Sequence, residues 1–144
     1  MSSQELPPED RPDTIDIGPV KGIPIIEDDD PRFQEDRAAW SAARKKAQAL
    51  ISADELLGGL QDADWRVRHE VVDRLIARAG SDPRTLPALL HSLANDVSWQ
   101  VRDAVAMRVH EFDPAVVVPA LERATEDPES EVRRAARYSL QQLR

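Results

Sequence analysis

The residues of this sequence that could carry out chemistry are three histidines, many carboxylates, and Asp and Arg residues that recur together at a fixed spacing. Cys is absent from the 144 residues, which excludes disulfides, thiolate metal sites and cysteine nucleophiles. His69, His91 and His110 stand alone, with no second His one helical turn away and no carboxylate at the spacing of a metal motif. No phosphate-binding loop and no nucleophile elbow is present. The sequence therefore predicts no catalytic residue, no cofactor and no metal ion.

The Asp and Arg residues recur in three segments that align without a gap, each of the form D-x(4)-V-R. The segments begin at Asp62, Asp96 and Asp127, so they are spaced by 34 and 31 residues. A stretch rich in Leu or Val precedes each segment, and apolar residues follow four and eight positions after each Val. This pattern predicts a pair of helices repeated three times, whose apolar faces are buried only when the pairs stack.

Capping residues indicate where these helices begin. Ser52 starts a capping box, S-x-x-E, and Asp82, Asp113 and Asp127 each precede a proline, as N-cap residues before a first-turn proline do. An additional helix is expected over 33–51, where apolar residues recur at helical spacing and Gly and Pro are absent from residue 34 on.

The three segments resemble HEAT-like repeats, of the short kind also found in phycobilin-lyase-type repeat proteins. The resemblance rests on the D-x(4)-V-R signature and on Pro87 and Pro119 in the preceding helices, and it covers residues 53–144. It implies an all-α fold, a short right-handed α-solenoid with an N-terminal capping helix. The expected helix pairs span 53–80, 83–112 and 114–144. The resemblance says little about function, because such repeats serve many roles.

A helical wheel places Arg68 at the centre of the apolar arc of its helix, where an unpaired charge is costly. The resemblance to HEAT-like repeats implies that these arginines form an inter-repeat ladder with the repeated aspartates. The competing interpretation of the aspartates is simple N-capping, and both roles are compatible. The predicted ladder consists of Asp62, Arg68, Asp96, Arg102, Asp127 and Arg133.

The opposite arc of each second helix is expected to line the groove of the solenoid. Ala, Met and Tyr form a small apolar patch there among charged side chains, a composition that suits a binding surface. The alternative is that neighbouring helices or the N-terminal segment cover this patch. Trp65 and Trp99 occupy equivalent positions, where packing between repeats is favoured over contact with a partner. The predicted groove residues are Glu70, Asp73, Ala104, Met107, Glu111, Ala135 and Tyr138.

Charge divides the chain into two parts. Residues 1–36 hold 11 acidic and 3 basic side chains, whereas the remainder holds 16 of each, so the net charge of -8 lies in the first part. This composition predicts a disordered acidic tail over 1–32, before the solenoid over 33–144. A branched apolar stretch at 14–26 is interpreted as plain disorder, as a strand resting on the chain's own domain, or as a linear motif that adds to a partner as an extended strand. Resistance to limited proteolysis would indicate self-docking. The motif residues are Ile15, Ile17, Val20, Ile23, Ile25 and Ile26.

The sequence also bears on compartment. No signal peptide is expected, because the N-terminus lacks a basic and an apolar region, and the longest apolar stretch is too short for a membrane span. The negative net charge argues against general nucleic-acid binding. We expect a cytoplasmic protein, and the excess of Arg over Lys, 16 to 3, resembles a bacterial source with a GC-rich genome.

Three functions are compatible with these patterns. The favoured one is a non-catalytic adaptor or scaffold that binds a protein partner through the groove, the acidic tail or both. The second is a small acidic inhibitor or immunity-type protein that blocks a basic enzyme or toxin, and acid concentrated on the groove would distinguish it. The third is an enzyme of HEAT-like fold, a bilin lyase or an alkylated-base glycosylase. A glycosylase needs a basic concave face and a longer chain, and no acid or nucleophile is singled out for a lyase.

Overall fold

The computed structural model describes the backbone of residues 31–143 and the side chains of residues 36–143. These residues form α-helices and one short 3₁₀ helix, without a β-strand. The predicted motif at 14–26 and nearly all of the predicted acidic tail lie outside the described residues. Contacts divide the chain after Asp36, and Arg37–Arg144 form the unit that carries the repeated helices.

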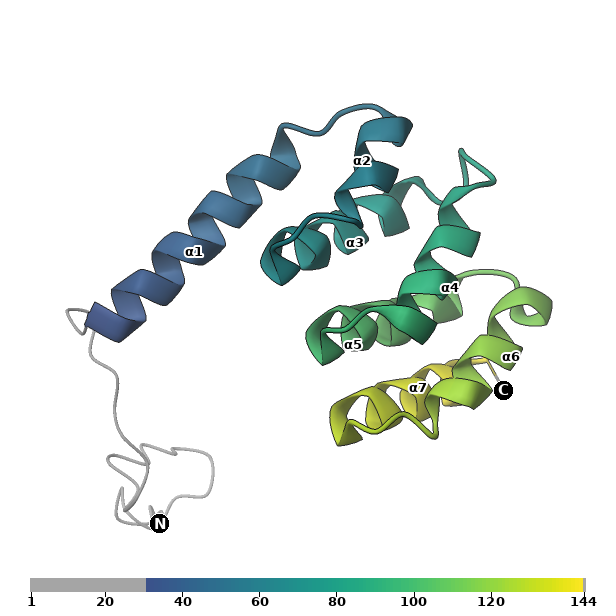
Figure 1. Cartoon of the computed structure of the whole chain (residues 1–144). Helices are drawn as coiled ribbons and strands as arrows, with labels where there is room; N and C mark the ends of the chain where they lie inside the picture. Colours follow the sequence, from purple (N-terminus) through teal and green to yellow (C-terminus); the bar gives the residue numbers. More distant parts are fainter. Residues whose placement is uncertain (1–30, 144) are drawn as a thin grey trace, which may run out of the picture. The chain divides into compact units, whose positions relative to one another are not determined.

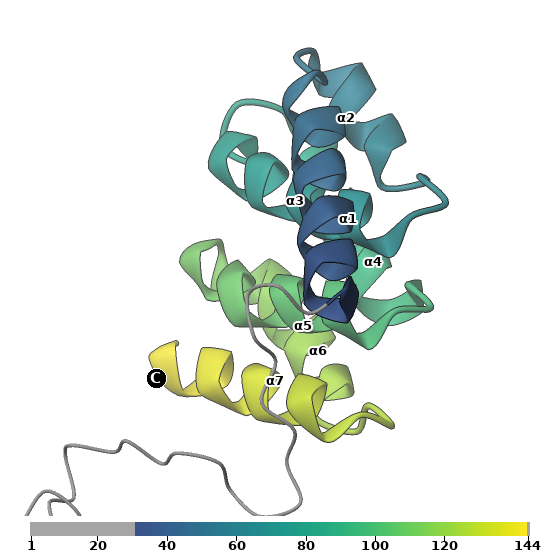
Figure 2. The same cartoon turned by 90° about the vertical axis from the view of Figure 1, so that its left-hand side faces the viewer.

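Six helices form three consecutive pairs in a short α-solenoid, and α1 precedes them (Figure 1). The first helices of the pairs lie in one layer and the second helices in another, and the pairs stack one after the other (Figure 2). The elements are α1 (Pro31–Gln48), α2 (Ala53–Gly59), α3 (Trp65–Arg78), α4 (Thr85–Asn95), α5 (Trp99–Arg108), η2 (Val109–Glu111), α6 (Pro114–Ala124) and α7 (Ser130–Gln142).

Two of the predicted helix starts are confirmed by their caps. The Ser52 hydroxyl accepts a hydrogen bond from the Glu55 N–H, and the Glu55 carboxylate accepts one from the Ser52 N–H, which completes the capping box of α2. The Asp113 carboxylate accepts from the Ala115 N–H at 3.0 Å, and Pro114 occupies the first turn of α6. Both arrangements satisfy N–H groups that have no partner inside the helix.

The two other predicted starts are wrong. α4 begins at Thr85 rather than directly after Asp82, and α7 begins at Ser130 rather than directly after Asp127. Each Asp instead accepts the N–H of the residue two positions later, at 2.9 Å in both cases, so that it closes a turn before the helix. Asp side chains favour this local turn, which competes with direct capping. The pKa of Asp82 is lowered to about 2 by hydrogen bonds from the side chain and the backbone of Arg84.

The hydrophobic core lies between the two layers of helices. The Val of every D-x(4)-V-R segment is buried, at 2% exposure or less, and each pair adds buried Leu or Val from its first helix. Each fully buried side chain of this size contributes about 1.5–3 kcal/mol relative to an exposed one. The buried valines of the three segments are Val67, Val101 and Val132.

Helix α1 contacts α3, the second helix of the first pair. Ala43 and Ala47 on α1 are buried, at 2% and 1% exposure. Trp40 contacts Trp65 and His69 edge to face, with ring centroids 5.3 Å apart in both cases. The contact between α1 and α3 is thus made by two small buried side chains of α1 and by aromatic rings of both helices.

We expect the two glycines of α2 to respond in opposite ways to alanine. A Cβ on Gly59 would lie 2.8 Å from a methyl group of buried Val71 and 2.9 Å from one of Leu50. Gly59→Ala should therefore lower the free energy of unfolding by about 1–3 kcal/mol through overpacking. A Cβ on Gly58 meets nothing within 4 Å, so Gly58→Ala should raise it by about 0.5–1 kcal/mol through helix propensity. Urea denaturation measures both variants, and equal effects would contradict the close packing at Gly59.

Candidate functional site

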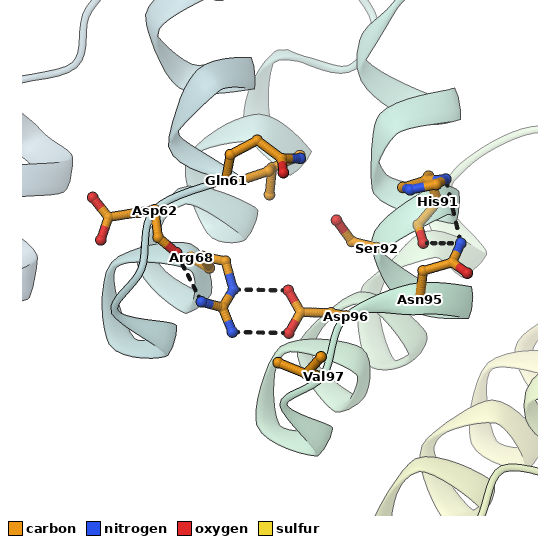
Figure 3. A pocket seen from close by; sticks show the side chains of 9 residues that line it. Gln61, Asp62, Arg68, His91, Ser92, Asn95, Asp96 and Val97 are labelled. Carbon is orange, nitrogen blue, oxygen red and sulfur yellow. Dashed lines mark hydrogen bonds and ion pairs between the residues drawn. The ribbon is translucent and has the colours of Figure 1, made fainter.

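A bidentate ion pair joins the first two helix pairs (Figure 3). Arg68 donates from Nε to Asp96 Oδ2 at 2.9 Å and from Nη2 to Asp96 Oδ1 at 3.1 Å. Its Nη1 donates to the backbone carbonyl of Asp62 at 2.8 Å. The two charged side chains are nearly buried, at 10% and 6% exposure. Planar, bidentate pairing is the geometry in which Arg binds a carboxylate most strongly.

The same arrangement joins the second and third helix pairs. Arg102 donates from Nε and Nη2 to the two carboxylate oxygens of Asp127, at 2.8 and 3.0 Å. Its Nη1 donates to the Asp96 carbonyl at 2.7 Å. In each of these two helix pairs, the arginine thus donates to the aspartate side chain of the next helix pair. It also donates to the backbone carbonyl of the aspartate in its own helix pair.

The structure places the ladder aspartates two positions before the N-cap, so the alternative of simple N-capping is wrong. Asp64 is the N-cap of α3 and accepts from the Arg66 N–H. Asp96 accepts from the Ser98 N–H at 2.8 Å, in a turn that leaves its carboxylate directed at the preceding repeat. One carboxylate therefore fixes both the local turn and the contact between repeats.

The two ends of the ladder differ from its middle. Asp62 has no preceding repeat to meet and pairs instead with Lys46 of α1, at 2.6 Å. This contact with Lys46 is the main reason that the pKa of Asp62 is lowered. Arg133 keeps its Nη1 bonds to the carbonyls of Asp127 and Pro128, at 2.7 and 3.0 Å, but within the described residues no carboxylate pairs with it.

A shallow depression opens over the first ion pair (Figure 3). Its polar lining includes Asn95, which donates to the His91 carbonyl at 3.0 Å, and the paired Arg68 and Asp96. Because the guanidinium and the carboxylate already satisfy one another, their role in this depression is structural. Among the described residues, no group of three His, Asp or Glu side chains could hold a metal ion.

The exposed face of the second helices carries one row of equivalent positions. Asp73, Met107 and Tyr138 occupy the same place in α3, α5 and α7, and all three are exposed, Met107 at 38% and Tyr138 at 43%. We call this row, together with the neighbouring His69, Asp103 and Arg134, the second-helix face. Glu111 is also exposed and belongs to its edge.

Part of the predicted groove is not accessible. Ala135 is 1% exposed, so its assignment to an exposed apolar patch is wrong, and Ala104 is half-buried against the core. Glu70, at the equivalent position, is half-buried and pairs with Arg44 of α1 at 3.8 Å. The physical reason is lateral packing. A helical wheel with one buried arc omits the second helix of the preceding repeat, which covers this position from the side.

Sequence analysis missed Asp103, which lies on the second-helix face beside His69 and Glu131. Desolvation and the Glu131 carboxylate together raise the pKa of Asp103. Within the described residues no Lys or Arg forms an ion pair with it. The aligned repeats could have revealed it, because the position directly after the Arg of each D-x(4)-V-R segment is polar in all three repeats: His69, Asp103 and Arg134.

Other charges of this face are already paired with one another. Arg108 donates to Asp73 at 2.9 Å across the repeats and lies 3.5 Å from Glu111 on the following turn. The Tyr138 ring packs edge to face on His110, with centroids 5.6 Å apart. The face therefore combines two exposed large side chains, an exposed ion-pair network and Asp103, a carboxylate with which no described Lys or Arg pairs.

We expect Arg102→Ala to be strongly destabilising. It leaves the Asp127 carboxylate, which is 9% exposed, without its counter-charge, and breaking a buried pair in this way costs about 3–5 kcal/mol. Arg133→Ala is the matched control, because it removes the same side chain where no carboxylate is held, and it should cost about 0.5–1.5 kcal/mol per lost hydrogen bond. Equal losses in urea denaturation at pH 7 would show that pairing with Asp127 is not the source of the stability.

Comparison with known proteins agrees with this architecture. The family model for HEAT repeats matches residues 23–109, which is more than half of the chain. A search of curated proteins finds no match. None of the helices in the described part is long and apolar enough to cross a membrane. The third helix pair lies beyond the matched residues, yet it is joined to the second by the same bidentate ion pair. By its sequence and its stacked helix pairs, the chain belongs to the HEAT repeat family.

Proposed function

We propose that this chain is a non-catalytic interaction module that binds a protein partner on its second-helix face. HEAT repeats generally act as scaffolds for protein interactions. The observation that carries the proposal is the placement of Met107 and Tyr138, two exposed large side chains at equivalent positions of adjacent repeats, beside the carboxylate of Asp103. Met and Tyr are enriched at the centres of protein interfaces.

The chemistry of the face indicates what the partner presents. An apolar side chain would fill the space between Met107 and Tyr138. A Lys or Arg beside it would pair with Asp103, whose partial burial makes the uncompensated charge unfavourable in the free protein. Such a cation gains more from the half-buried carboxylate than from a fully solvated one. The favoured partner segment therefore combines an apolar anchor with a basic residue.

The rigidity of the face supports binding as well. Tyr138 is held by the edge-to-face contact with His110, and neighbouring Ser139 donates to the Ala106 carbonyl of the preceding repeat. Side chains that are already ordered lose less conformational entropy when a partner binds. The acidic segment before residue 37 is a second candidate contact, because its charge would attract a basic partner from a distance.

Site-specific photo-crosslinking tests this proposal. A photoreactive amino acid is placed at position 107 or 138 of the full chain, and in a control at Val116, which is 45% exposed on α6. We expect one protein to be crosslinked from both positions of the face and not from position 116. Asp103→Lys should abolish that crosslink, since it places a cation where the partner's cation would lie. The same products from all three positions would contradict the proposal.

We expect Asp103→Asn to stabilise the protein at neutral pH while it weakens partner binding. Because the folded-state pKa of Asp103 is raised, ionisation is less favourable in the folded than in the unfolded state. The wild type therefore loses stability as the pH rises from the ordinary pKa of Asp, about 3.9, through the folded value. The gain in free energy of unfolding caused by Asp103→Asn should be complete above this pH range and absent below it.

The matched control for this pH series is Asp73→Asn. Asp73 is exposed and paired with Arg108, so its replacement should bring no gain in stability at pH 7. Denaturation midpoints of the two variants and the wild type between pH 3 and pH 8 test whether ionisation of Asp103 lowers the stability of the folded protein. A gain in Asp103→Asn that persists unchanged at the acidic end would rule out ionisation of Asp103 as its cause.

A further inference from the structure

The last guanidinium of the ladder is oriented in the same way as the two that hold a carboxylate. In all three repeats, Nη1 of the arginine donates to the carbonyl of the aspartate six positions earlier, at 2.7–2.8 Å. In Arg68 and Arg102 this leaves Nε and Nη2 facing the aspartate of the next repeat. In Arg133 the same two donors meet no carboxylate of the described residues, so a fixed bidentate donor pair is available there.

The helix face around Arg133 is not built to receive another helix pair of the same kind. Val72 and Ala106, at equivalent positions of α3 and α5, are completely buried against the next repeat. The third repeat has exposed Arg137 at this position. At the position of Ile76, which is 6% exposed, the second repeat has half-buried His110 and the third has exposed Gln141. Apolar stacking is therefore replaced by cationic and polar groups, and the face is suited to charged rather than apolar ligands.

We infer that this end of the solenoid, formed by Arg133 and Arg137, binds an acidic segment of a partner protein. One carboxylate takes the bidentate position on Arg133, as Asp96 and Asp127 do on the preceding arginines. A second carboxylate pairs with Arg137, one helical turn further along α7, about 6 Å away along the axis. A hollow beside Arg137 is lined also by Glu122, Thr125, Leu140 and Gln141, so the second carboxylate pairs with Arg137 on the side away from Glu122.

The geometry of the inner ion pairs defines the preferred ligand more closely. Asp96 and Asp127 each present their carboxylate from a turn in which the side chain also accepts the N–H of the residue two positions later. An Asp in such a turn, as at Asp96-Val97 or at Asp127-Pro128 in its acidic context, reproduces this presentation. This site is distinct from the second-helix face, so the two can succeed or fail separately: Arg133 and Arg137 take no part in the crosslinking at positions 107 and 138.

A peptide with the sequence of residues 122–131, ERATEDPESE, is a suitable probe because it contains the Asp that Arg102 holds. Its binding to the full chain is followed through the Arg133 Nε–H signal in nitrogen–proton NMR, which is assigned by its loss in Arg133→Lys. We expect a saturable shift with a dissociation constant of about 0.1–1 mM at low salt, as for a contact of a few ion pairs. Raising NaCl from about 0.05 to about 0.5 M should weaken binding at least about fivefold by screening.

Variants and a control peptide make the test specific. Because neither Arg133 variant has the Arg133 Nε–H signal, the affinities of all variants and of the wild type are compared through the fluorescence anisotropy of a dye-labelled peptide. Arg133→Gln should weaken binding about tenfold or more. Arg133→Lys, which keeps the charge but loses the planar donor pair, should weaken it about threefold or more. The control Arg123→Gln removes another exposed arginine, on α6, and should leave affinity unchanged. The peptide with Asp127→Asn should bind at least about tenfold more weakly. Denaturation midpoints establish that each variant is folded.

Three results would overturn the proposal. The first is no saturable shift at Arg133 up to several millimolar peptide. The second is equal weakening by Arg123→Gln and Arg133→Gln, which would indicate unspecific attraction to positive charge. The third concerns the chain's own acidic run at 27–30. If replacing its four carboxylates by amides in the full chain alters the Arg133 signal without peptide, the occupant is this segment and not a partner.

Discussion

The stacking of this molecule depends on the need to pair an arginine that lies within an apolar seam. Arg68 and Arg102 project from the buried side of their helices, where the cost of an isolated charge is many times that of a surface charge. The carboxylate of the next repeat and the carbonyl of the same repeat supply the missing partners. The pairing therefore sets which residues of consecutive repeats lie opposite each other, and the surrounding valines pack in the register that it allows.

This constraint explains how repeats of different length keep the same geometry. The D-x(4)-V-R segments are spaced by 34 and then 31 residues, yet the two ion pairs have nearly the same distances. The difference is taken up mainly between each second helix and the next first helix. Six residues separate α3 from α4, whereas two residues separate η2 from α6. The connection that carries the aspartate varies as well, with three residues between α4 and α5 and five between α6 and α7. The distance in sequence from the aspartate to the following helix is the same in both.

Most of the fold could be predicted from the sequence because the repeat carries its own pattern. The gapless D-x(4)-V-R alignment locates the three buried valines, and the S-x-x-E box locates the start of α2. The burial of Ala135 could not be predicted, since it results from a neighbouring repeat packed beside the helix rather than from the helix's own periodicity. The turns at Asp82 and Asp127 could not be predicted, because an Asp before a proline is compatible with an N-cap and with a turn that precedes the helix. The sequence alone does not distinguish the two. Whether residues 14–26 form a partner motif stays a prediction.

The surfaces left after stacking follow from the same arrangement. Helix α1 occupies one end, where Lys46 pairs with the first ladder aspartate. At the other end the Arg133 guanidinium keeps its orientation, and no carboxylate of residues 36–143 pairs with it. Between them the second helices expose only the positions that neither lateral neighbour covers. On α5 and α7 these include Met107 and Tyr138, which occupy equivalent positions of adjacent repeats.

The direction of the ion pairs bears on how such chains can lengthen. The middle helix pair contributes Asp96 to the repeat before it and Arg102 to the repeat after it. A tandem duplication of this pair would therefore place a new Asp opposite an existing Arg, and a new Arg opposite an existing Asp, with no further substitution. With respect to the ion pairs, the middle helix pair is therefore a self-complementary unit. Asp62, which pairs with Lys46, and Arg133, which pairs with no carboxylate of the described residues, do not have this reciprocity.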